Sequence, residues 1–194
     1  MPTPASYAIR FASHIEGYFA AIVLAALLVG LVPANSLSSQ TVPQRASSSY
    51  RAGPLELQLW ELINRDRADP SNSRETRGRA PALQWDDRLA AIARMHSEEM
   101  ARKGFFSHEG ADGSSPSRRV SMAGIKWLST GENIANCGGV SEAESLFMNE
   151  PKFQQNHRWN ILNVNYTHVG VGVARAPDGS LYITQEFAQL SQAR

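Results

Sequence analysis

The sequence predicts an α+β fold in which helices cover a small sheet. Helical periodicity fills the first part of the folded region, and strict alternation of apolar and polar residues fills its end. Residues 168–174 and 181–187 alternate on either side of a turn at 176–180, which predicts an antiparallel hairpin. Short strands are expected near 126–129. Helices that precede a hairpin in this way are expected to pack onto one sheet.

The first helix is expected to begin at Pro54, because proline is favoured in the first turn of a helix. Leucine and isoleucine recur at helical spacing after it, and Asp69-Pro70 ends the pattern. The polar stretch 71–80 is expected to be a loop.

A second helix is expected from Asp86, a good N-cap, to Lys103, with Gly104 as the C-cap. His96 falls on the apolar face of this helix. Its position favours a core histidine bonded to a backbone carbonyl over a ligand.

Two shorter helices are expected further along the chain. One follows Ser115-Pro116 and covers 117–124, and the other covers about 141–150. The second carries a capping-box pattern at 141–144, and Pro151 stops it.

The hairpin is expected to contribute core through Val169, Val171 and Val173, which share one face of the first strand. Gly170 and Gly172 occupy the other face. Because glycine has no side chain, another element is expected to pack closely there.

The N-terminal region predicts export. Residues 18–32 form an apolar run without charge that is short for a membrane span and suits the core of a signal peptide. Residues 1–34 are therefore expected to be a signal peptide or an uncleaved anchor, followed by a serine-rich flexible linker at 35–53 and a folded domain at 54–190. Both alternatives place the domain outside the cytoplasm, and contact with a membrane is expected only through the N-terminal segment, if it is retained.

Composition excludes several classes of protein. The 19 lysines and arginines nearly balance the 18 aspartates and glutamates, so the net charge gives no electrostatic reason to expect binding to nucleic acid, which favours a basic face. The single cysteine, Cys137, allows neither an intrachain disulfide nor a thiolate zinc cluster. Cys137 fits a small buried apolar residue better than a nucleophile.

Four residues are candidates for a shared site: His108, Glu132, Glu150 and His157. Two imidazoles and two carboxylates form a ligand set that Zn²⁺ or a similar divalent ion accepts. The spacing contains no HExxH motif and no pair of histidines four residues apart, so spacing alone does not establish a metal site.

The motifs LWELINRDRA, LQWDDRLAAIARMHSEEMA, FFSHEG, SPSRR, GENIA, NHRWNIL and VGVGVA…LYITQEF occur in this order over about residues 55–188. Together they resemble the bacterial, YkwD-like branch of the CAP superfamily, which includes the cysteine-rich secretory proteins, venom antigens and plant pathogenesis-related proteins. The resemblance implies a three-layer α-β-α sandwich of the CAP/SCP type, ending in the hairpin. A lone cysteine agrees with the bacterial branch, because the eukaryotic members carry disulfides.

The resemblance also implies an open cleft lined by two histidines and two glutamates, which correspond to His108, Glu132, Glu150 and His157, with Asn133 and Arg158 as supporting residues. Many bacterial relatives have serine where this chain has Glu150. The link from Glu150 to His157 is also four residues longer in this chain.

For function, the resemblance implies an exported protein whose cleft binds a divalent metal such as Zn²⁺ or a small amphipathic ligand, such as a lipid or a component of the cell envelope. One alternative is a metal-dependent hydrolase with Glu132 or Glu150 as base. Another is a ligand-free structural or interaction domain in which the four residues only bond one another. The sequence shows no nucleophile beside a positioned base, so binding is the first interpretation and hydrolysis the last.

Overall fold

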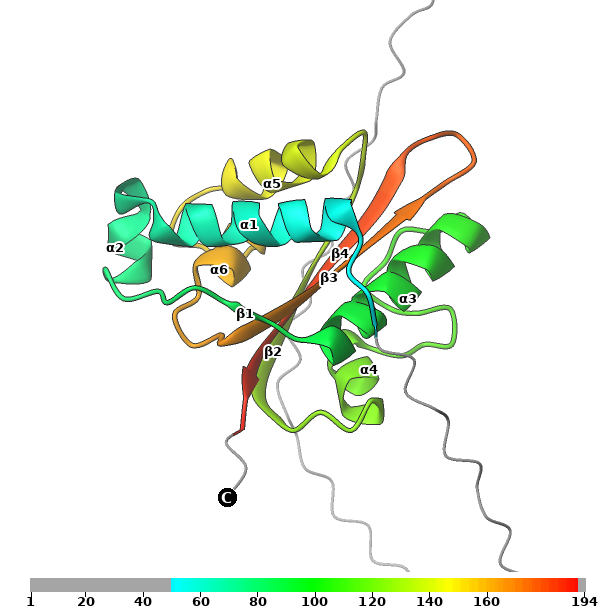
Figure 1. The fold of residues 1–194 in the computed structure, drawn as a ribbon, viewed down its shortest axis with the longest axis horizontal. Coiled ribbons are helices and arrows are strands. Elements are labelled where there is room, and N and C mark those ends of the chain that lie inside the picture. Colours follow the sequence, from blue (N-terminus) through cyan, green and yellow to red (C-terminus); the bar gives the residue numbers. More distant parts are fainter. Residues whose placement is uncertain (1–49, 192–194) are drawn as a thin grey trace, which may run out of the picture. The chain divides into compact units, whose positions relative to one another are not determined.

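The computed structural model describes residues 50–191, which form a four-stranded sheet with helices on both faces (Figure 1). The strand order is β1-β3-β4-β2, and every neighbouring pair is antiparallel except the parallel pair β1–β3. The strands are β1 (Gln84–Trp85), β2 (Trp127–Cys137), β3 (His168–Arg175) and β4 (Leu181–Leu190). The predicted signal peptide and most of the predicted linker lie outside the described residues. Within the described part, no helix is long and apolar enough to cross a membrane.

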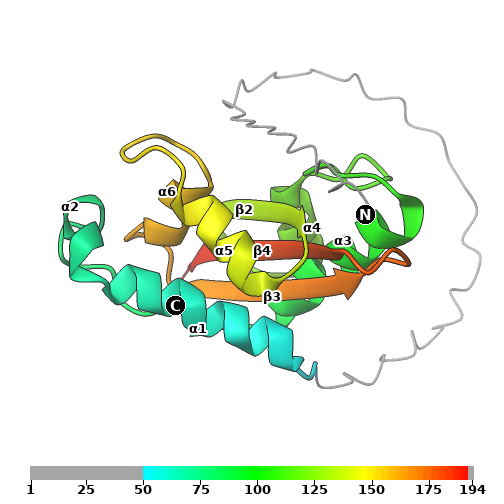
Figure 2. The same cartoon turned by 90° about the horizontal axis from the view of Figure 1, so that it is seen from above.

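The helices form two layers, one on each face of the sheet (Figure 2). One layer contains α1 (Pro54–Ala68), α5 (Val140–Met148) and α6 (His157–Leu162), and the other contains α3 (Asp87–Lys103) with α4 (Pro116–Met122). Each layer has its own apolar core against the sheet: Leu59, Phe147 and Phe187 belong to the first, and Leu89 and Val120 to the second. The predicted α-β-α sandwich with a C-terminal hairpin is therefore confirmed.

The ends of α1 and α3 agree with the sequence prediction. Helix α1 begins at Pro54 and ends before Asp69. The Asp86 side chain accepts the N–H groups of Arg88 and Leu89 at 2.9 and 3.1 Å, and Gly104 ends α3 at φ 68°. Local capping chemistry fixes these boundaries, so they could be predicted from sequence alone.

The expected loop at 71–80 is wrong in its first part. A 3₁₀ turn, η1 (Pro70–Asn72), leads into the short helix α2 (Ser73–Thr76). The Asp69 side chain accepts the N–H of Ser71 at 2.8 Å and starts this turn. Its polar composition resembles that of a loop, but an N-cap followed by proline is also the start signal of a helix.

The expected capping box at 141–144 is also wrong. Helix α5 begins one residue earlier, at Val140, and its N-cap is Gly139. Glu144 does not return to the helix start. It is buried, and its Oε2 accepts a hydrogen bond from Gln185 at 2.8 Å.

Strand β2 is much longer than the short strand expected near 126–129. It continues through the whole GENIAN motif and pairs with β4, with Glu132 opposite Glu186 and Asn133 opposite Gln185. The buried positions of this stretch include glutamate and asparagine, so apolar alternation could not reveal it. Strand β1 and helix α6 were not predicted as elements either.

Gly170 and Gly172 lie where α3 crosses β3, as the sequence predicted. A Cβ on Gly170 would collide with the backbone of Leu89 and Ala90, and one on Gly172 with the backbone of Ala93 and Arg94. Because backbone atoms of a helix cannot move aside cheaply, these two glycines set the distance between α3 and the sheet.

We expect Gly170→Ala to destabilise the domain by about 3 kcal/mol or more, because the added methyl group overpacks the α3–β3 contact. Chemical denaturation measures this change. Gly139→Ala is the matched control, since a Cβ at Gly139 would meet no atom of the described residues within 4 Å beyond its chain neighbours. Equal stability losses in the two variants would contradict the close crossing.

Candidate functional site

The first half of the site is built from the loop after α3 and from β2. Nδ1 of His108 lies 2.7 Å from Oε1 of Glu132, and Nη2 of Arg119 donates to Oε2 of Glu132 at 2.5 Å. Arg119 also donates to the carbonyl oxygens of His108 and Ser114. One arginine on α4 therefore holds both the carboxylate and the loop that carries His108.

Glu132 is ionised although it is buried. Burial would raise its pKa, but the hydrogen bond from His108 and the positive charge of Arg119 outweigh burial and lower it. Because an ionised carboxylate only accepts hydrogen bonds, Nδ1 of His108 carries the proton. Nε2 of His108 is then the nitrogen left for a ligand.

Glu186 faces Glu132 across the β2–β4 pair and is completely buried. Burial and repulsion from Glu132 raise the pKa of Glu186 well above its usual value, so it is neutral. Within the described residues, both of its oxygens lack a hydrogen-bond partner, as do Nδ1 of His96 and Nε of Arg119. The layer beneath Glu132 is therefore polar and only partly satisfied by the protein itself.

The second half of the site is built from the end of α5 and the start of α6. Oε1 of Glu150 lies 2.6 Å from Nδ1 of His157, and Oε2 accepts the backbone N–H of His157 at 2.8 Å. The ring of Phe147 packs against the His157 imidazole at a centroid distance of 4.9 Å. Glu150 thus contacts His157 directly, although the link between them is four residues longer than in the relatives that the resemblance implies.

The two histidine–glutamate pairs lie side by side. The rings of His108 and His157 are nearly parallel, with centroids 6.4 Å apart, and their side chains are 20% and 17% exposed. We call these four residues the paired-histidine site: His108, Glu132, Glu150 and His157. Residues 50–191 contain no group of three or more histidine, cysteine or acidic side chains already arranged around a metal position.

A buried polar network joins the site to the core. Asn133, one of the two expected supporting residues, donates from Nδ2 to the carbonyl oxygen of His157 at 3.1 Å and to Oε1 of Gln185 at 2.8 Å. Gln185 in turn donates to Glu144. The amide of Asn160 donates to Oδ1 of Asn133 at 2.8 Å. The start of α6 is thereby fixed to β2, β4 and α5.

Arg158, the other expected supporting residue, acts on the opposite side of α6. It is buried, forms an ion pair with Glu75 at 2.7 Å and donates to the side chain of Asn72 and the carbonyl oxygen of Met148. Arg158 thus ties α6 to α2 and to the end of α5.

Two other sequence interpretations are confirmed. Nε2 of the buried His96 lies 2.9 Å from the carbonyl oxygen of Ser107, and burial lowers the pKa of this histidine. Cys137 is free and buried, and burial raises the pKa of its thiol, so it is not an activated nucleophile.

Three residues around the site were missed by sequence reasoning: Arg119, Gln185 and Glu186. The SPSRR and TQEF motifs contain them, but no local signal shows which arginine turns toward Glu132. Glu186 could have been found only with the β2–β4 register, which places it opposite Glu132.

The four-stranded sheet between two layers of helices places this chain among the three-layer α-β-α domains of the CAP/SCP type. The family model of the cysteine-rich secretory protein family matches residues 60–187. The chain belongs to this family, as the order of its motifs indicated.

Two curated relatives are proteins of Bacillus subtilis. YkwD of Bacillus subtilis (strain 168) is 33% identical over 156 residues, which are 80% of this chain and 54% of YkwD. The membrane protein YlbC of the same organism is 36% identical over 107 residues, 54% of this chain and 28% of YlbC. The chain thus spans about half the length of the first relative and less of the second.

Solved structures show the same fold. An extracellular SCP-domain protein from Bacillus anthracis is 28% identical with a TM-score of 0.50, and the match covers 71% of this chain and 45% of that protein. An outer surface protein of Borrelia burgdorferi has a TM-score of 0.58 at 16% identity, over 70% of this chain and 92% of that protein. The second likeness shows the fold alone.

The buried Glu144 leads us to predict how the stability of the domain depends on pH. Burial raises its pKa to about 8, so the folded protein keeps a proton that the unfolded chain loses above pH about 4.5. Stability should therefore fall between these pH values, with Glu144 contributing up to about 1.4 kcal/mol per pH unit. Glu144→Gln should remove this contribution and stabilise the protein at neutral pH.

Denaturation curves at several pH values test this expectation. Glu98→Gln, on the exposed surface of α3, is the control and should leave the slope in place. A slope that is the same in Glu144→Gln and wild type would show that Glu144 is ionised in the folded state.

Proposed function

We propose that this chain is an exported domain that binds a divalent ion, Zn²⁺ in the first place, through Nε2 of His108 and Nε2 of His157. In this proposal Glu132 and Glu150 orient the two rings through Nδ1 and do not contact the ion. This arrangement differs from the four-ligand set expected from the sequence. Export is supported by the N-terminal apolar run and by the likeness to the extracellular protein of Bacillus anthracis.

The observation that carries the proposal is the pairing of each imidazole with its own carboxylate. A glutamate contacts Nδ1 of each ring at 2.6–2.7 Å, and within the described residues neither Nε2 forms a hydrogen bond. A carboxylate on the second ring nitrogen is the usual partner of a metal-binding histidine, because it fixes the ring and raises its basicity. The residues present therefore fit a site with two protein ligands and further positions open to water or a ligand.

Binding is better supported than hydrolysis by the same contacts. Glu132 is held by His108 and Arg119, and Glu150 by His157, so neither carboxylate is free to act as a general base. A bound ion would supply Lewis acidity toward a donor atom of a ligand. The residues of the chain would orient that ligand beside the two rings.

Zinc titration of the purified full-length chain, against a chromogenic competitor, tests the proposal. We expect one equivalent of tightly bound zinc, and we expect His108→Ala and His157→Ala each to abolish stoichiometric uptake while the domain remains folded. His168→Ala, on β3, is the matched control and should bind like the wild type. Because protons compete for Nε2, uptake should weaken in acid.

Replacing a glutamate that orients one of the histidines should weaken zinc binding without abolishing it. Glu150→Gln should lower zinc affinity by roughly 10–100-fold without abolishing uptake, as is usual for partners of metal-binding histidines. Unchanged zinc binding in the His108→Ala, His157→Ala double variant would favour the structural alternative, in which these four residues only stabilise one another.

A further inference from the structure

Four basic side chains gather at the end of the domain formed by α2. Arg74, Arg77 and Arg79 belong to α2 and the turn after it, and Lys152 belongs to the loop between α5 and α6. All four are exposed, and within the described residues none forms an ion pair or a side-chain hydrogen bond. We call these four residues the basic corner.

The α5–α6 loop lies next to α2 (Figures 1 and 2), and the charge of Lys152 acts on Glu75 of α2 and on Asp69 before it. The pKa of Glu75 is lowered first by its hydrogen bond from Arg158, and further by the charge of Lys152 and the backbone N–H of Phe153. Glu75 is therefore already neutralised by Arg158. Asp69 is the other carboxylate near Lys152, and its charge offsets only one of the four.

The basic corner concentrates positive charge in a domain whose charged side chains are otherwise more often negative. Residues 50–191 contain 16 arginines and lysines against 17 aspartates and glutamates. Because burial keeps Glu144 and Glu186 neutral, the 12 cations of residues 50–191 outside the basic corner face 15 ionised carboxylates, a small excess of negative charge. Such a separation of charge orients a protein in front of an anionic partner.

Phe153, the residue after Lys152, has an unusually exposed side chain and an unusual backbone conformation. Its side chain is 68% exposed, and its backbone adopts φ 62°, a left-handed conformation that is strained for a bulky residue. The amide of Asn156 donates to the carbonyl oxygen of Pro151 at 2.9 Å and closes the loop around it. The loop thus holds an aromatic ring in water beside a lysine, at a cost in both strain and hydration.

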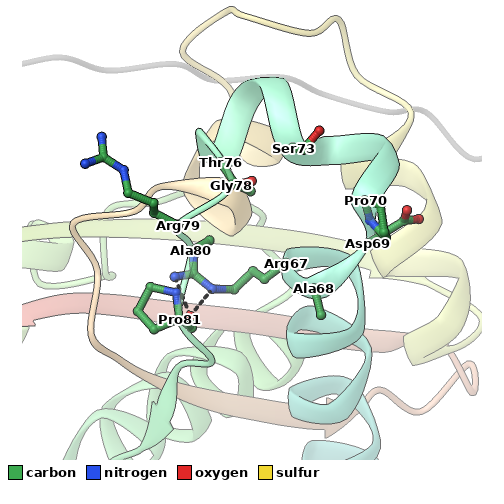
Figure 3. Close-up of a pocket in the computed structure, with 10 residues that line it drawn as sticks. All are labelled: Arg67, Ala68, Asp69, Pro70, Ser73, Thr76, Gly78, Arg79, Ala80 and Pro81. Atoms are coloured by element: carbon green, nitrogen blue, oxygen red, sulfur yellow. Dashed lines mark hydrogen bonds between the residues drawn. The ribbon is translucent and has the colours of Figure 1, made fainter.

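A hollow of about 460 Å³ lies at the same end, between the end of α1 and residues 78–81 (Figure 3). Arg79 borders this hollow and extends away from the other lining residues, whereas Arg67 is turned inward to the carbonyl oxygen of Pro81. None of the paired-histidine residues lines the hollow. No hydrogen bond or ion pair joins a side chain of the basic corner to the paired-histidine site within the described residues.

We propose that the basic corner and Phe153 form a docking surface for an anionic lipid bilayer. Arginine and lysine are attracted to anionic headgroups, and an aromatic ring next to them enters the interfacial layer. A soluble polyanion would match the four cations but would give no role to the exposed ring. The proposal goes beyond the proposed metal binding and does not depend on it.

A fluorescent label near Phe153 tests the docking in the full-length chain. Gln154→Cys offers the attachment point, because Gln154 is exposed and the natural Cys137 is buried. An environment-sensitive dye at 154 should shift to the blue with vesicles of phosphatidylcholine and phosphatidylglycerol, and not with phosphatidylcholine alone. The same dye attached through Glu98→Cys on α3 should not shift, which separates docking from any binding by the N-terminal segment.

Two variants separate the charges from the ring. Each lysine or arginine at an anionic bilayer changes binding roughly fivefold, so Arg77→Glu with Arg79→Glu should move the docking equilibrium by roughly 25-fold or more and abolish the shift. Phe153→Asn should reduce the shift, although asparagine suits the left-handed backbone better than phenylalanine. Arg102→Glu at the end of α3 is the charge control and should keep the full shift. All of these variants should bind zinc like the wild type.

Three results would overturn the proposal. One is no blue shift on anionic vesicles, and another is an equal shift on phosphatidylcholine alone. The third is a shift that a soluble polyphosphate reproduces without vesicles, which would make an anionic polymer the partner of the basic corner.

Discussion

The pleat of β2 is the constraint on which the rest of the site depends. Consecutive residues of a strand point to opposite faces, so Glu132 faces the α3–α4 layer and Asn133 faces the α5–α6 layer. Glu132 holds His108 from one face, and Asn133 holds the backbone of His157 from the other. Because β2 is an edge strand, the two layers can meet beside it, and the two imidazoles come together there. A one-residue slip of β2 against β4 would exchange these faces and separate the two halves.

The β2–β4 register that places Glu132 also brings a second carboxyl group, that of Glu186, next to it inside the core. Two carboxyl groups face each other at the Glu132–Glu186 position, and one arginine serves them. Only one can ionise, and Arg119 with His108 decides that it is Glu132. The neutral Glu186 and the atoms of His96 and Arg119 that find no partner among residues 50–191 are costly to bury. A domain selected for stability alone would place apolar residues there, so this polar layer is better explained by what it does for His108.

Sequence reasoning succeeded where a local rule decides the structure. The caps of α3, the hairpin and the paired glycines of β3 each follow from a few neighbouring residues. It failed where burial is polar: GENIAN was not predicted to belong to a strand, yet Asn133 and Glu132 are buried in the sheet because distant residues satisfy them. The four residues of the paired-histidine site were predicted from their residue types and from the order of the motifs, whereas Arg119 and Glu186 required the packing of α4 and the register of β4. Polar partners from other elements leave no periodic trace in the sequence.

The link between Glu150 and His157 shows how part of the site can vary in length without losing its geometry. Oε2 of Glu150 accepts the first backbone N–H of α6, and Oε1 contacts Nδ1 of the same residue. Two contacts to one residue fix the carboxylate relative to the ring, and the unpaired N–H groups at a helix start favour a negative charge there. The intervening chain then only has to close a loop, and extra residues add little entropic cost. The loop that carries Lys152 and Phe153 is therefore free to acquire a role at the α2 end of the domain while the paired-histidine site keeps its contacts.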